Sequence, residues 1–181
     1  MPGILAFANR FCVLAEKPGN CSISPMEIVV NNRQRRVRVE MAWLRAFAQA
    51  ALARCQHHSD DGLFALKLEG EVEVAIVTDD EISRVHQDFM GIPGPTDVIT
   101  FEHGEIVISA DTARAYAKEH GHPVDEELAL YIVHGLLHLN GYDDTKKKAK
   151  ERMFSVQNKI WRELRAELGP SVGAAPPSPP A

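Results

Sequence analysis

Two histidines and an aspartate in the run HGLLHLNGYDD, residues 134 to 144, have the types and spacing of a metal site. His134 and His138 are one helical turn apart, so in a helix their rings lie on the same face. Gly141 can end that helix in a left-handed turn, and the reversal can carry Asp144 back toward the pair. Two nitrogens and one oxygen, with a fourth position open to water, form the catalytic rather than the structural zinc pattern. We therefore predict one zinc ion, or another divalent transition metal, held by His134, His138 and Asp144.

The same residues also have ordinary uses. Two histidines on an apolar helix are more often packed or solvated residues than ligands. Asp144, like Asp143 and Thr145, is suited to capping the helix that follows. Gly135 favours the metal site, because a glycine inside a helix costs about 1 kcal/mol relative to alanine and indicates close packing there. In HExxH zinc peptidases this position holds the general-base glutamate, so a peptidase would need its base elsewhere.

The metal motif resembles the HGxLHLxGYDH signature of the YbeY family, which comprises bacterial metal-dependent endoribonucleases specific for single-stranded RNA. A second block, GPTDVITFEHGEIVIS at residues 94 to 109, is similar to the family's PTDVLSF followed by GDIVIS. The resemblance runs from about Met26 to Leu164. It implies a role in ribosomal RNA maturation and ribosome quality control, with single-stranded rRNA and the ribosome or its assembly factors as partners. It implies neither a membrane nor DNA as a partner.

Two positions depart from the family pattern. The family's third ligand is usually histidine, and the aspartate at position 144 is an acceptable substitute that alters the affinity for zinc. The family also carries an arginine shortly before PTDV, a suspected contact of the phosphate, where this chain has Met90. Beside the endoribonuclease, two alternatives therefore stay open: a small metallopeptidase, and a ribosome-associated metal-binding protein whose catalysis has lapsed.

The second block adds two polar residues to the predicted catalytic set of His134 and His138. Asp97 is expected to accept the outer N–H of a metal-bound histidine and so fix its tautomer, although such an aspartate is often only a turn residue. His103 is expected to donate a proton to the leaving oxygen of the RNA, although an exposed loop histidine is often only solvated.

Local basic clusters are the expected RNA contacts. The formal net charge of −5 argues against a protein that coats nucleic acid through bulk electrostatics. Phosphate contacts are made by groups of arginine and lysine, and we predict them at Arg33, Arg35 and Arg36 and, beside the metal motif, at Lys146 and Lys147. Solvated strand edges and helix faces explain such charges about as well.

Composition indicates one domain in a reducing compartment. A chain of 181 residues with 45% hydrophobic content suits a single core of good size. The three cysteines, Cys12, Cys21 and Cys55, form neither an even disulfide framework nor a CxxC pattern, which favours the cytoplasm.

The predicted boundaries divide the chain into three parts. Residues 1–25 have only short apolar runs interrupted by Arg10, and we expect an extension from an upstream start codon rather than a secretory signal or membrane span. Residues 26–168 form the YbeY-like metallohydrolase domain. Residues 169–181 are expected to be a disordered tail rich in proline and alanine.

Periodicity places the motifs on a mixed fold. Apolar repeats and turn signals predict strands at 26–30, 71–78, 96–101 and 105–109. They predict helices at 40–55, 79–87, 110–120 and 145–168, with another, opened by Pro123 or Asp125, that carries the metal motif. We therefore expect an α/β (α+β) domain, in which a mixed sheet of about four strands packs with helices and the metal site lies on a central helix.

Overall fold

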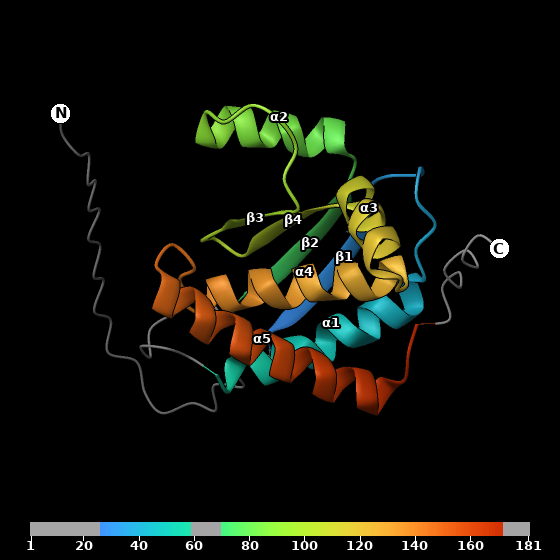
Figure 1. Ribbon diagram of the computed structural model, residues 1–181, viewed down its shortest axis with the longest axis vertical. Coiled ribbons are helices and arrows are strands. Elements are labelled where there is room, and N and C mark those ends of the chain that lie inside the picture. The colour runs from blue at the N-terminus through green and yellow to red at the C-terminus, as the bar shows by residue number, and fades with distance from the viewer. Residues whose placement is uncertain (1–25, 59–69, 172–181) are drawn as a thin grey trace, which may run out of the picture.

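A mixed four-stranded sheet organises the protein (Figure 1). The computed structural model describes residues 26–58 and 70–171. Its strands lie in the order β1-β2-β4-β3. The first three of these are parallel, and β3 runs antiparallel to β4. Their bounds are Glu27–Asn32 for β1, Glu71–Val77 for β2, Val98–Phe101 for β3 and Glu105–Ser109 for β4. The predicted α/β fold of a single domain is confirmed.

Helices cover both faces of this sheet unequally (Figure 1). One face carries α2, while α1 and α4 pack on the other, with α3 beside α4 and α5 outermost against α1 and α4. Their bounds are Met41–Gln56 for α1, Asp79–Met90 for α2, Ala110–His120 for α3, Val124–Leu139 for α4 and Lys147–Leu168 for α5. The metal motif therefore lies on a helix between the sheet and α5, as the sequence predicted.

Burial on both faces explains the apolar run at the end of β2. Val74 and Ile76 face the main core under α1 and α4, whereas Ala75 and Val77 face a smaller core under α2. Strands covered on both sides lose the alternation of a half-exposed strand. The sheet is therefore packed on both faces, with α4 lying over the larger of the two cores.

Most boundaries differ from prediction by a few residues. α2 continues to Met90, because Gly91 with φ 69° ends it, rather than stopping near residue 87. β1 continues to Asn32, where the polar run seemed to end it, because the ladder with β2 extends that far. Ser109 caps α3 by accepting from the amide of Thr112.

The expected tail is wrong for its first residues. The indole of Trp43 donates to the carbonyl of Gly169 at 3.1 Å, and the hydroxyl of Ser171 donates to Asp125 at 2.7 Å. The other carboxylate oxygen of Asp125 accepts from the amide of Glu40 at 2.9 Å. Residues 169–171 therefore pack on the starts of α1 and α4. The predicted N-terminal extension, 1–25, and the rest of the tail, 172–181, lie outside the described residues.

Within 26–58 and 70–171, no helix combines the length and apolarity that a membrane span requires.

Cys55, a buried free thiol, has its pKa raised by burial to about 12. A buried thiol with a raised pKa is a poor nucleophile.

Candidate metal centre and its cavity

α4 presents the two histidines to a cavity that β3 also lines, and Gly135 shows how closely another face of the helix approaches β4. A Cβ atom at position 135 would lie 2.7 Å from a methyl carbon of Ile106. This confirms the close packing predicted from the glycine. It also means that a glutamate at this position would meet the core, so the geometry has no place for the general base of an HExxH peptidase.

The turn after α4 returns the chain toward the histidines. Gly141 has φ 87°, and its amide donates to the carbonyl of His138 at 2.9 Å. The side chain of Asn140 donates to the carbonyls of Cys55 and His58 at 2.7 and 2.6 Å, which anchors the turn to the end of α1. The left-handed reversal predicted at Gly141 is confirmed.

The three predicted ligands lie together as a result. One carboxylate oxygen of Asp144 is 4.0 Å from Nε2 of His138, and one ligand atom from each of His134, His138 and Asp144 lies within 4.8 Å of the others. α5 begins at Lys147 without a side-chain cap, so Asp144 does not cap it. The carboxylate is therefore available to a metal ion.

Hydrogen bonds at the outer ring nitrogens fix which nitrogens face each other. Nδ1 of His134 lies 2.9 Å from Oε1 of Gln157, and Nδ1 of His138 lies 2.9 Å from the carbonyl oxygen of Tyr142. Both partners are acceptors, so each Nδ1 carries the proton and each Nε2 presents a lone pair in the neutral ring. The two Nε2 atoms lie 3.0 Å apart.

Two lone pairs at this distance repel unless a cation lies between them. Two nitrogen ligands of one tetrahedral zinc ion, at about 2.0–2.1 Å from the metal, lie roughly 3.3 Å apart. Burial, followed by the neighbouring His138, lowers the pKa of His134, which favours the neutral ring that a metal needs. The residues present therefore fit a zinc-like ion.

The expected partner of these histidines is not Asp97. Gln157 and the carbonyl of Tyr142 hold the outer nitrogens. Asp97 instead accepts from the hydroxyl of Thr96 at 3.0 Å and from the amide of Val98 at 2.9 Å, because its carboxylate turns back on the start of β3. Asp97 still lines the cavity beside the histidines, and its role in catalysis stays a prediction.

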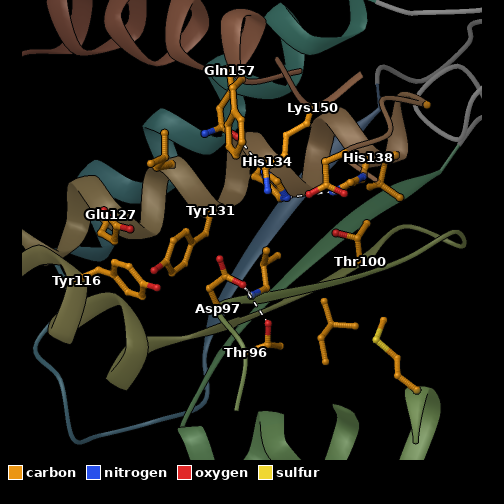
Figure 2. A pocket seen from close by; sticks show the side chains of 18 of the residues that line it. Thr96, Asp97, Thr100, Tyr116, Glu127, Tyr131, His134, His138, Lys150 and Gln157 are labelled. Carbon is orange, nitrogen blue, oxygen red and sulfur yellow. Dashed lines mark hydrogen bonds and ion pairs between the residues drawn. The ribbon is translucent and has the colours of Figure 1, made fainter. Parts of the chain in front are cut away.

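A cavity of about 950 Å³ contains the metal motif. Its lining comes from β3, α3, α4, α5 and the end of α2. Figure 2 shows the cationic Lys150 beside the two histidines and, at the opposite end, an aromatic and acidic group. That second group is Tyr116, Glu127 and Tyr131.

Other predicted residues lie elsewhere. His103 is exposed in the turn between β3 and β4, 3.6 Å from Glu105, and does not belong to the described lining of the cavity. A proton donor must reach the leaving oxygen, so this position argues against the role expected for His103.

The predicted RNA contacts also fall outside that lining. Arg33 pairs with Glu73 at 2.7 Å and Arg36 with Asp80 at 2.8 Å. Arg35, Lys146 and Lys147 are exposed, and their contact with RNA stays a prediction.

Lys150 belongs to the same run of lysines as Lys146 and Lys147 and, unlike them, lines the cavity. Its ammonium group lies 5.4 Å from the ring centre of Phe154. Lys150, Phe154 and Gln157 all line the cavity and follow one another at i, i+4 and i+7 on α5, the spacing of a single helix face. This shared face was the signal available in the sequence.

Sequence comparison identifies the family. A family model described as Endoribonuclease YbeY matches residues 29–165. The chain belongs to the YbeY family. Endoribonuclease YbeY of Bacillus velezensis is 40% identical over 124 residues, 55% of this chain and 79% of that protein. The one from Desulfitobacterium hafniense is 33% identical over 143 residues, 69% of this chain and 88% of that protein.

A solved structure has a similar fold. The solution structure of TM1509 from Thermotoga maritima is 27% identical, with a TM-score of 0.55 over 77% of this chain and 90% of that one. YbeY membership confirms both the resemblance and the hydrolase class that the two motifs predicted.

Proposed function

We propose that this protein is a zinc-dependent endoribonuclease that cuts single-stranded rRNA during maturation and ribosome quality control. The observation that carries the proposal is the facing pair of Nε2 atoms, 3.0 Å apart, in a cavity that also contains Lys150. Membership of the YbeY family supplies the substrate class. The ribosome or its assembly factors as partners, and the cytoplasm as location, belong to the same proposal.

The chain's own residues would bind and orient the RNA. Zinc, held by His134, His138 and Asp144, would supply Lewis acidity toward a water molecule and a phosphate oxygen. Gln157 holds the ring of His134 in the tautomer that ligation needs. Lys150 places a positive charge in the same cavity, where it would attract the scissile phosphate.

A proton acceptor for the attacking water is also required. The cavity offers the carboxylates of Asp97 and Glu127. Glu127 lies 3.2 Å from Nε2 of His122, and burial is the main cause that raises its pKa. Asp97 has no such histidine contact and accepts only from Thr96 and Val98 among the described hydrogen bonds. We therefore assign to Asp97 the role of accepting the proton of the attacking water.

Cleavage assays test the proposal. The protein should cut a single-stranded RNA oligonucleotide, leave a duplex of the same sequence intact and lose activity with a chelator. His138→Ala should abolish cleavage, whereas His57→Ala, at the exposed end of α1, should not. An unstructured peptide should stay uncut. Cleavage of the peptide instead of RNA would favour the metallopeptidase, and a bound metal without cleavage of either would favour the lapsed enzyme.

A further inference from the structure

The end of the cavity away from Lys150 differs from the metal end in chemistry. Tyr116 from α3 and Glu127 and Tyr131 from α4 lie there, with Asp97 between them and the histidines (Figure 2). Two carboxylates and two phenols replace the lysine and histidines of the metal end. Carboxylates repel phosphate, so this half suits a part of the RNA other than its backbone.

Tyr131 has a buried hydroxyl directed toward the acidic part of the cavity. The residue is 6% exposed, and its hydroxyl makes no hydrogen bond of normal geometry within the described ranges, although the carboxylate of Glu127 lies near enough to interact with it. Figure 2 shows the hydroxyl directed away from α4, toward Tyr116 and Asp97. Buried polar groups are nearly always paired. Burial, followed by nearby Glu127, raises the pKa of Tyr131, so the hydroxyl keeps its proton and can donate.

Tyr116 supplies an aromatic surface at the mouth of this region. Its side chain is 49% exposed, and its ring lies nearly parallel to that of His120, with an interplanar angle of 7° and centres 6.1 Å apart. The ring of Tyr116 is thus supported by His120 on the same helix and remains partly open to solvent. Exposed aromatic rings of this kind stack on the bases of single-stranded nucleic acids.

We propose that Tyr116, Glu127 and Tyr131 form a base-binding subsite that accepts adenine, cytosine or guanine and disfavours uracil. The inference rests on the proposed function and deepens it, since the base would belong to a nucleotide near the scissile phosphate.

The hydrogen-bonding groups of the bases give this preference. A carboxylate accepts from the amino group of adenine, cytosine or guanine. A phenol hydroxyl can then donate to the neighbouring ring nitrogen of adenine or cytosine, or to the carbonyl oxygen of guanine. Uracil lacks an amino group. A carboxylate could accept from its single ring N3–H, but the carbonyl oxygens on both sides of that N–H would then lie against the carboxylate oxygens of Glu127. A site whose polar groups are left unpaired rejects a ligand strongly.

Binding of nucleoside 5′-monophosphates tests the subsite independently of cleavage, because these probes contain no phosphodiester bond. The metal-loaded protein is titrated with AMP, CMP and UMP at fixed salt, with chemical shifts or heat as the readout. AMP and CMP should bind about fivefold or more tightly than UMP. Tyr131→Phe should reduce that preference to less than about twofold.

Two variants of Tyr116 separate stacking from folding. Tyr116→Ala should weaken binding of all the nucleotides about tenfold, whereas Tyr116→Phe, which keeps the ring, should bind like the wild type. His57→Ala serves as the surface control, and thermal midpoints show that each variant folds.

Equal affinities for AMP, CMP and UMP in the wild type would overturn the subsite, as would an unchanged preference in Tyr131→Phe. RNA cleavage with no nucleotide preference would refute this inference alone. The predicted preference in a protein that cuts no RNA would refute the proposed function and leave the subsite in place.

Discussion

Nε2 of His134 and Nε2 of His138 face each other across 3.0 Å, while each Nδ1 lies against an acceptor oxygen. The acceptors are Gln157 on α5 and the backbone carbonyl of Tyr142 after the turn. The metal site therefore depends on a second helix as well as on the motif itself. This dependence leads to the first prediction.

Replacing Gln157 with methionine should weaken metal binding without removing a ligand. Partners that orient a ligating histidine are typically worth about 10- to 100-fold in metal affinity, and methionine fills a similar volume. Competition with a chromogenic chelator measures the affinity. Asn158→Ala, exposed on the next position of α5, is the matched control and should bind metal like the wild type. An unaffected Gln157→Met would mean that this hydrogen bond does not support the site.

Asp144→His should keep or tighten metal binding, and Asp144→Ala should weaken it. The carboxylate lies 4.0 Å from Nε2 of His138, and imidazole at this position recreates a three-histidine shell that suits zinc. Metal content per chain after dialysis gives the readout. If Asp144→Ala keeps its metal and Asp144→His loses it, Asp144 is not a metal ligand.

Met90→Arg should raise RNA cleavage. Met90 ends α2, is 52% exposed and lines the cavity, so an arginine there stays solvated and can approach a phosphate. One preorganised cation near developing charge contributes on the order of 3 kcal/mol, about a hundredfold in rate. The melting temperature should not change. Met90→Gln, which keeps a similar length and adds polarity without charge, is the control and should give no such gain. An unchanged rate in a stable Met90→Arg would show that Lys150 or another group already supplies the charge.

The stability of Glu127→Gln relative to the wild type should increase as the pH rises. Burial raises the pKa of Glu127 above its usual 4.5, so the folded state holds this proton more tightly than the unfolded state. The wild type therefore loses stability as the pH rises from about 4.5 through the higher folded pKa, and glutamine does not titrate. The difference in melting temperature, variant minus wild type, should become more positive between pH 4 and pH 7. A constant difference would mean that the His122 contact offsets the cost of burial.

The sequence predicted the features that depend on short spacings. His134 and His138 share a face because they are one turn apart. Gly135 indicated close packing, which the structure places against β4, and Gly141 indicated the reversal toward Asp144. Each of these depends on residues near one another in the chain. The strands and helices were predicted for the same reason.

Contacts between elements that are far apart in the chain could not be predicted from such local spacings. Gln157 replaces Asp97 as the partner of His134 because α5 packs over α4, and no local spacing specifies that pairing. Tyr116 and Tyr131 join one cavity only because α3 lies against α4. His103 looked suitable because it lies within the family block, yet the turn after β3 points it toward Glu105.

Elemental analysis of the purified protein tests the metal centre most directly. We predict about one zinc or similar divalent ion per chain, held by the ligand set of His134, His138 and Asp144 in the described part of the chain, lost in His138→Ala and retained in His57→Ala. Wild-type protein that contains no metal after incubation with zinc and dialysis, or a His138→Ala variant that keeps its full complement, would contradict the account.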